Sequence, residues 1–173
     1  ILASLLLPAL GKAKERARGI RCLSNIRQVS LATVLYGNDH AEYIVMLYMN
    51  GATRPGAWFP STDGTWWVDS LRPYMHTTNV IKCPSVRVGF GIAQNHPDIG
   101  GWRENPAKLT AIKNPSDTVP YADGGLIANP TERNPDLWRE RKDMSQLYYR
   151  TPANETYYDT DPVRAVNRHG RRC

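Results

Sequence analysis

The sequence predicts an α+β fold in which one long amino-terminal helix precedes a body of short strands and long connections. Strong helix formers dominate residues 2–36, which favours a single helix there. The thirteen prolines and thirteen glycines of this 173-residue chain lie mostly after residue 50, which favours short strands over helices that alternate with parallel strands. Because there is no fixed-period repeat and no long linker, we expect a helix at 1–36 and one globular body at 37–173.

The predicted helix has three informative features. Pro8 removes one backbone hydrogen bond and predicts a kink. Gly37, which precedes Asn38-Asp39, predicts a helix end with a left-handed cap. Four apolar residues share one face at the 3.6-residue period, with Arg27 between them: Ile20, Leu23, Leu31 and Val34. This half of the helix is therefore amphipathic and requires a partner surface.

The body is expected to start with a loop at 50–65 that aromatic residues hold in place. A short helix is predicted at 66–74, since a proline stands near its end. Alternating apolar residues predict three short strands: 80–83, 86–92 and 118–122. Asp123-Gly124-Gly125 should end the last strand, and residues 128–162, rich in Pro, Asn, Asp and Glu, should be loops with a little helix.

Composition sets wide bounds on the class of protein. The chain is 41% hydrophobic and 22% charged, as is ordinary for a globular protein and unlike a disordered one. Its mean hydropathy of −0.50 argues against several membrane spans. The net charge of +6 comes largely from residues 12–27 and from a tail that contains Arg164, Arg168, Arg171 and Arg172. Such charge is compatible with nucleic acid, anionic lipid or solubility alone.

The chain has three cysteines: Cys22, Cys83 and Cys173. Their spacing matches neither the C-x-x-C of zinc and thioredoxin-like sites nor the C-x-x-C-H of haem attachment, so we do not expect a metal–thiolate or haem site. If the chain is exported, a disulfide between Cys22 and Cys83 would tie the helix to the body. The alternative is two buried free thiols, and the sequence leaves both open.

The helix begins with an apolar segment of about ten residues, which is shorter than the roughly 20 needed to cross a bilayer. The chain also begins without methionine. We therefore expect a further segment upstream of Ile1.

Several segments together resemble a known family. They are residues 1–14 (ILASLLLPALGKAK), 21–28 (RCLSNIRQ) and 35–39 (LYGND), followed in order by Trp66-Trp67, 71–74 (LRPY), 82–85 (KCPS), 114–119 (NPSDTV) and 168–170 (RHG). The chain resembles bacterial type II secretion pseudopilins and type IV pilin-like proteins, most of all the planctomycete and verrucomicrobial prepilin-type group. The leader and processing site of that family lie outside this chain. The chain also stops at Cys173, where relatives continue into a final strand.

The resemblance implies a kinked helix packed on a small antiparallel sheet. It also implies a structural subunit that is anchored in the inner membrane and then polymerises, through secretion or pilus assembly machinery, into a homo-oligomeric helical filament at the cell surface. The resemblance implies an assembly role for one set of residues: Ile1, Leu2, Leu5, Leu6, Leu7, Pro8 and Leu10. Burying each of the apolar side chains in the filament would contribute roughly 1.5–3 kcal/mol.

Other candidate sites are weaker. Five basic residues could bind phosphates, but an ion-pair or solvated face is favoured for them: Lys12, Lys14, Arg16, Arg18 and Arg21. Asp159 and Asp161, with Glu155 nearby, could bind calcium, as some pseudopilins do in a late loop. Their spacing is not that of an EF-hand, so a solvated acidic turn is favoured. We therefore expect no cofactor.

The histidines are scattered and no catalytic motif is present, so we expect no enzymatic activity. The chain has five tryptophans, Trp58, Trp66, Trp67, Trp102 and Trp138. Packing in the core and at subunit interfaces is the favoured interpretation of these rings. The alternative function is a helix-anchored cell-surface binding module for nucleic acid or glycan.

Overall fold

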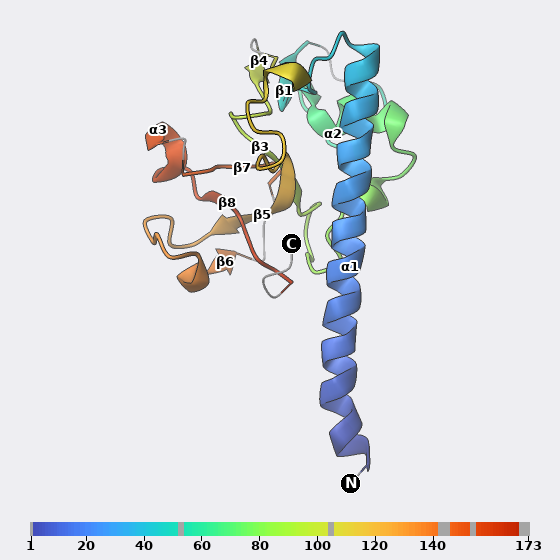
Figure 1. Cartoon of the computed structure of the whole chain (residues 1–173), viewed down its shortest axis with the longest axis vertical. Helices are drawn as coiled ribbons and strands as arrows, with labels where there is room; N and C mark the ends of the chain where they lie inside the picture. Colours follow the sequence, from blue (N-terminus) through green and yellow to red (C-terminus); the bar gives the residue numbers. More distant parts are fainter. Residues whose placement is uncertain (1, 52–53, 104–105, 142–145, 153–154, 170–173) are drawn as a thin grey trace.

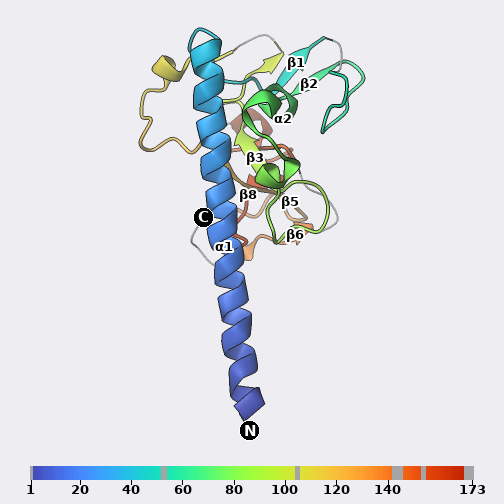
Figure 2. The same ribbon diagram turned by 90° about the vertical axis from the view of Figure 1, so that its right-hand side faces the viewer.

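The computed structural model describes residues 2–51, 54–103, 106–141, 146–152 and 155–169, without the side chains of 2–5 and 155–156. One long helix, α1 (Leu2–Asp39), dominates the molecule. Its carboxyl-terminal half lies against a body of short strands, and its amino-terminal half projects beyond that body in both views (Figure 1 and Figure 2). The predicted α+β class and the long amino-terminal helix are confirmed.

The predicted kink at Pro8 is wrong. Helix α1 runs without a break through Pro8, and neither Figure 1 nor Figure 2 shows a sharp bend along it. Pro8 lies only six residues after the helix start at Leu2, so its missing N–H removes a single bond, to the carbonyl of Ser4. The long helix that follows keeps its own hydrogen bonds.

The predicted left-handed cap at Gly37 is also wrong. Gly37 is still inside α1, and the left-handed backbone falls later, at Ala41 (φ 51°) and Glu42 (φ 67°). Position 37 lies close to the body. A Cβ atom there would lie 2.7 Å from Cδ1 of Leu109, so any larger residue would require the Leu109 side chain to shift.

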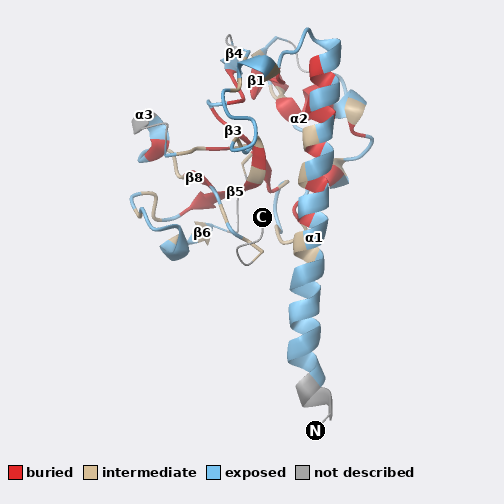
Figure 3. Ribbon diagram, viewed as in Figure 1, coloured by how far each residue is buried: buried red, intermediate tan, exposed pale blue. Residues whose placement is uncertain are grey.

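The body contacts α1 along one side only. The buried residues of the helix lie on one side, most of them three or four positions apart: Cys22, Asn25, Val29, Ala32, Thr33, Tyr36 and Gly37. The apolar side chains among them share one hydrophobic core with body residues such as Trp67, Leu71 and Ile92. Figure 3 shows this buried side on the carboxyl-terminal half of the helix, whereas residues 6–17 are exposed.

Two sheets form the framework of the body. One has the order β2-β1-β4, made by β1 (Tyr48–Asn50), β2 (Gly64–Trp66) and β4 (Trp102–Arg103). The other has the order β6-β5-β3-β7 with β8 also paired to β5, made by β3 (Ile92–Asn95), β5 (Tyr121–Ile127), β6 (Glu140–Arg141), β7 (Tyr148–Tyr149) and β8 (Val163–Ala165). The expected single antiparallel sheet is wrong, because β1–β4 and β3–β7 are parallel pairs.

The structure extends the last predicted strand through the glycines that should have ended it. Strand β5 includes Asp123, Gly124 and Gly125. These glycines allow close approach instead of a turn. A Cβ atom on Gly125, for example, would lie 2.9 Å from a methyl group of Val166. The strand therefore holds Asp123 in the middle of the sheet.

The strands predicted at 80–83 and 86–92 are largely wrong. Residues Thr78–Ile81 form a 3₁₀ turn, η2, capped by the Thr77 side chain, which accepts a hydrogen bond from the Asn79 amide. Residues 84–91 form turns, with one isolated bridge between Lys82 and Gly91. Pairing as a strand begins only at Ile92.

The remaining predictions agree with the structure in part. Strand β2 takes up residues 64–66 of the predicted loop and helix, β5 begins only at Tyr121, and β6 and β7 lie in the predicted loop-rich region. Residues 54–63 form a loop whose Trp58 and Phe59 amides donate hydrogen bonds to the buried Asp69 carboxylate, over 2.5 and 3.1 Å. The short helix at 66–74 is two successive turns, α2 (Trp67–Ser70) and η1 (Arg72–Tyr74). The other short elements are η3 (Leu109–Ala111), η4 (Pro135–Leu137) and α3 (Glu155–Tyr158). The last two lie in the predicted loop-rich region.

Candidate functional site

The side of α1 that faces away from the body carries a second apolar pattern. Successive positions of this pattern are alternately four and three residues apart. Two of the positions are polar, Ser24 and Arg27, and the others are apolar: Leu6, Leu10, Ala13, Ala17, Ile20, Leu31 and Val34. We call these seven residues the apolar row. At 3.6 residues per turn, the row lies opposite the buried side of the helix. A spacing of four and three is that of helices that pack along each other.

The apolar row is open to solvent in the described chain. The side chains of Leu6 and Leu10 are 66% and 67% exposed, and Ile20 is 71% exposed. Leu31 and Val34 continue the row beside the body and are exposed as well. The body therefore leaves uncovered the apolar face that the sequence identified at 20–34.

The structure places only part of the predicted assembly set. Leu6, Leu7, Pro8 and Leu10 are exposed on the projecting half of α1. Ile1 and the side chains of Leu2 and Leu5 lie outside the described residues. Among the described residues, no helix is long and apolar enough to cross a membrane.

The predicted basic face is not one face. At 3.6 residues per turn, Lys12 and Arg16 lie beside the apolar row, whereas Lys14, Arg18 and Arg21 lie on the other side of the helix. Arg18 pairs with Glu15 over 2.5 Å. The basic residues thus flank the helix on two sides, which fits ion pairing better than a single phosphate-binding surface.

The two acidic residues considered for calcium already have partners. Asp159 pairs with Arg133 over 2.9 Å, and Asp161 pairs with Arg150 over 2.9 Å. Asp161 also accepts hydrogen bonds from the Tyr148 hydroxyl and the Val163 amide. The Glu155 side chain lies outside the described residues. This geometry favours an ion-paired acidic turn over a calcium site.

An aromatic cluster covers the small sheet at the end of the body. Trp102 is 42% exposed and stacks on Tyr48 with ring centroids 4.9 Å apart. Trp66 packs edge-on against both rings, and Arg103 lies over them. Most of these rings contact one another, as expected for packing, and Trp102 is the exposed member.

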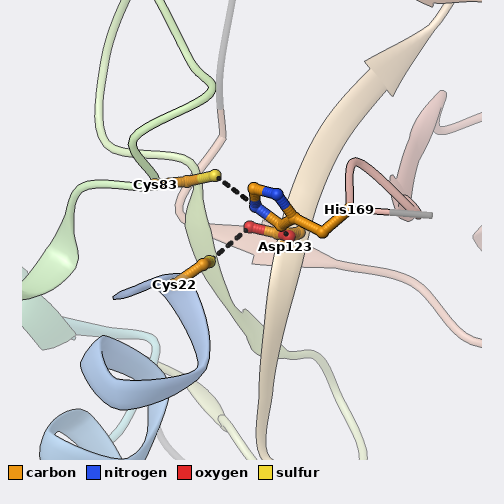
Figure 4. Close-up of side chains that lie close together, drawn as sticks. All are labelled: Cys22, Cys83, Asp123 and His169. Carbon is orange, nitrogen blue, oxygen red and sulfur yellow. Dashed lines mark hydrogen bonds and ion pairs between the residues drawn. The ribbon is translucent and has the colours of Figure 1, made fainter. Parts of the chain in front are cut away.

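The two cysteines for which the sequence left a disulfide open lie close together, Cys22 on α1 and Cys83 in the turn after η2. Cys22 and Cys83 are both buried free thiols, the second of the two alternatives that the sequence left open. Their sulfur atoms, a carboxylate oxygen of Asp123 and a ring nitrogen of His169 all lie within 4.8 Å of one another. Figure 4 shows the four side chains converging from four different segments. We call them the Cys-Asp-His cluster.

Specific contacts join the members of the Cys-Asp-His cluster. The Cys22 thiol donates a hydrogen bond to Oδ1 of Asp123 over 3.0 Å, and Cys83 Sγ lies 3.3 Å from Nε2 of His169. Nε2 of His169 also lies 3.5 Å from Oδ2 of Asp123. The side chains of Asp123 and His169 are only 0% and 1% exposed, so water does not screen these contacts.

The surrounding chain positions the cluster. Arg168 is held by Glu140, over 2.5 Å, and by the Gly124 carbonyl, over 2.5 Å, and its guanidinium lies 3.5 Å from Oδ1 of Asp123. A Cβ atom on Gly19 would lie 3.2 Å from the Cβ of His169. Gly19 therefore leaves room for the His169 side chain to lie against α1.

The pKa values of the two thiols diverge. The hydrogen bond with Cys22 lowers the pKa of Cys83 to about 7, against the opposing effect of burial. The same hydrogen bond, and then burial, raise the pKa of Cys22. Of the two sulfur atoms, Cys83 is therefore the one that more readily becomes a thiolate.

The cluster does not have the geometry of a cysteine–histidine–aspartate catalytic triad. In such a triad the carboxylate holds Nδ1 and the nucleophile contacts Nε2. Here Cys83 and Asp123 both face Nε2 of His169, and Nδ1 has no hydrogen-bond partner among the described residues. The imidazole therefore has no orienting acid on the far side, and the donor atoms point toward a common centre.

Sequence reasoning identified Cys22 and Cys83 but missed Asp123 and His169. The signal was weak, because the four residues come from α1, the turn after η2, strand β5 and the tail after β8, so no local spacing joins them. In the sequence, Asp123 stands before two glycines that are typical of a turn, and His169 belongs to the segment 168–170 that carries part of the family resemblance.

No family model, no curated protein and no solved structure matches this chain. What the fold and its surfaces define is an α+β protein with a long helix that is buried on one side and apolar on the other.

Proposed function

We propose that this protein is a structural subunit that polymerises through α1 into a helical filament of the type IV pilus or type II secretion pseudopilus kind. The observation behind this proposal is the apolar row, which runs along the side of α1 opposite the body. Surface helices of monomeric proteins ordinarily turn their apolar side inward and their polar side to solvent. A helix that is apolar on its outer side as well has a second surface to bury.

The dimensions of the apolar row favour a second copy of the same helix as its partner. From Leu6 to Val34 the row is about 42 Å long, at about 1.5 Å per residue. A partner must therefore be long and straight, as α1 itself is. The alternating spacing of four and three positions over this length is that of helices that pack side by side.

Charge along the helix favours a staggered arrangement over pairing in register. Lys12, Arg16 and Arg27 lie beside or within the row, so two parallel helices in register would set like charges against each other. An axial offset separates these charges and makes the contact heterologous. Heterologous contacts that do not close into a ring generate helical filaments.

The resemblance to pilin-like proteins supports the same proposal. On this proposal the subunit would be held in the inner membrane before assembly, with help from secretion or pilus assembly machinery, and the filament would lie at the cell surface. Its role would be structural and not enzymatic.

The test is negative-stain electron microscopy of the chain at increasing concentration. The wild-type chain should form filaments, and the double variant Ile20→Glu, Leu31→Glu should not, because two charges would be buried in the helix contact. The matched control is Val119→Glu, Leu137→Glu, two apolar residues of the body that are 55% and 57% exposed. Filaments of the control but not of the row variant support the proposal. Equal assembly of both variants, or none by the wild type, contradicts it.

The alternative is a helix-anchored surface module that binds nucleic acid or glycan. Its best support is the exposed ring of Trp102, with Arg103 beside it. The two-sided distribution of basic residues on α1 supports it less. A gel shift of DNA that weakens with salt, without polymerisation, would favour this alternative.

A further inference from the structure

We propose that Cys22, Cys83, Asp123 and His169 bind one zinc ion, which fastens helix α1 to the body. This inference is independent of the proposed filament. It rests on the position, burial, donor chemistry and charge of four side chains that no local sequence motif connects.

The distances fit a tetrahedral ion. With bonds of about 2.3 Å to sulfur and about 2.0–2.2 Å to nitrogen and oxygen, the ligand atoms of a zinc site lie roughly 3.3–3.8 Å apart. The measured separations are 3.3 Å from Cys83 Sγ to His169 Nε2 and 3.5 Å from that nitrogen to Asp123 Oδ2. All four donors lie within 4.8 Å of one another, so small side-chain rotations suffice to bring them into place.

The hydrogen bonding of the cluster leaves a position for a cation. Oδ2 of Asp123 is buried and has no hydrogen-bond partner among the described residues. The nearest ring nitrogen, Nε2 of His169, is shared with the sulfur of Cys83. A buried carboxylate oxygen that lacks a donor is costly. An ion at the centre would coordinate this oxygen, the ring nitrogen and both sulfur atoms at once.

The donor set selects the class of metal. Two thiolates, one imidazole and one carboxylate make up a mixed sulfur, nitrogen and oxygen set that suits Zn²⁺. Calcium and magnesium prefer oxygen ligands alone. Four protein ligands leave no open position for water, which is the arrangement of structural and not of catalytic zinc.

Most of the charge is compensated. Two thiolates and one carboxylate carry three negative charges, and Zn²⁺ neutralises two of them. The buried guanidinium of Arg168 lies 3.5 Å from Oδ1 of Asp123 and also pairs with Glu140, so it shares its positive charge between the site and the partly exposed Glu140 carboxylate. A buried ionic site of this kind is tolerable only when its charges are compensated in this way.

The site would join segments that local structure does not hold together. Cys22 belongs to α1 and Asp123 to β5, whereas Cys83 and His169 lie in irregular segments after η2 and β8. Nearby, the side-chain amide of Asn25 fastens the turn at Asn79–Lys82 to the helix by two hydrogen bonds, of 3.0 and 2.9 Å. Zinc would add a second and stronger attachment at the same place.

The test uses the full chain with Cys173→Ser, so that Cys22 and Cys83 are the only thiols. After purification with zinc and removal of loose metal, elemental analysis should find about one zinc per chain. Both thiols should resist alkylation until a chelator is added, and the chelator should lower Tm. Cys22→Ser and Cys83→Ser should each lose the metal, whereas His76→Ala, an exposed histidine outside the cluster, should retain it.

A second measurement separates loss of a ligand from loss of the fold. Titration of Co²⁺ into the metal-free Cys173→Ser protein should produce a thiolate-to-cobalt charge-transfer band. The band should stop growing at about one Co²⁺ per chain, as expected for a single site. His169→Cys, which replaces nitrogen by a third sulfur, should keep this band and strengthen it.

Two results would overturn the proposal. One is a folded protein without zinc or a cobalt band whose two thiols react freely. The other is a folded protein whose mass is lower by two hydrogen atoms and whose thiols do not react, since this would show that Cys22 and Cys83 form a disulfide.

Discussion

Gly124 of strand β5 lies so close to Ala93 of strand β3 that a Cβ atom on Gly124 would stand 2.2 Å from the Cβ of Ala93. Both residues are buried, so neither strand can move away without opening the sheet. Gly124→Ala should therefore lower the free energy of unfolding by about 1–3 kcal/mol, the usual cost of overpacking. Urea denaturation followed by circular dichroism measures this change.

The control for that substitution is Gly11→Ala on the projecting half of α1. A Cβ atom on Gly11 would meet nothing within 4 Å, and alanine is the better helix former by about 1 kcal/mol. Gly11→Ala should thus be neutral or stabilising. If both alanine variants unfold at the same urea concentration, this result contradicts the close approach of β3 and β5 at Gly124.

Asn25 holds the turn before Cys83 against the helix. Its side-chain Nδ2 donates to the carbonyls of Asn79 and Lys82, over 3.0 and 2.9 Å. Asn25→Ala removes both hydrogen bonds and should cost about 2–3 kcal/mol of stability. Gln28→Ala, at an exposed position one turn further along, should change stability by no more than about 0.5 kcal/mol. Equal midpoints for the two variants in urea denaturation would argue against this anchor.

His96 should make stability depend on pH. Burial lowers the pKa of His96 below the ordinary value of 6.5, and the neutral ring contacts the Gly100 carbonyl through Nδ1 over 2.6 Å. Above pH 6.5 the ring is neutral in both the folded and the unfolded chain. As the pH falls below 6.5, the unfolded chain binds a proton at this ring before the folded chain does. The free energy of unfolding therefore decreases with falling pH until the pH reaches the lower pKa of the folded chain.

The measurement for His96 compares the wild type with His96→Gln at several pH values. Between about pH 7.5 and 5.5, where Asp and Glu keep their charges, the difference in unfolding free energy between the two proteins should shrink. A difference that stays constant over this range would show that His96 is not the titrating group.

The helix illustrates what sequence can predict and what it cannot. Helix formers at 2–36 predicted α1 almost to its end, because local propensity decides such a segment. The period of the apolar residues also identified the second half of the row, at Ile20, Leu31 and Val34, but not its first half at 6–17. The sequence did not reveal which side of the helix meets the body, since Cys22, Asn25 and Ala32 are small or polar and form no conspicuous apolar pattern.

The body was harder to predict for a different reason. Its strands are two to seven residues long, so pairing depends on contacts between distant segments and not on local pattern. Gly124 and Gly125 looked like a turn and are instead sites of close approach in β5. The Cys-Asp-His cluster combines four such distant segments, and only the fold brings its members together.

The most direct test of the assembly proposal is hydrogen exchange of α1 before and after polymerisation. In the monomer, residues 6–18 project from the body and should exchange quickly, because an isolated helix end has few contacts to protect it. In filaments the exchange of this segment should slow markedly, and more than that of the outer strands of the body. If residues 6–18 exchange equally fast in both states while the body gains protection, assembly proceeds through another surface and the proposed role of α1 is wrong.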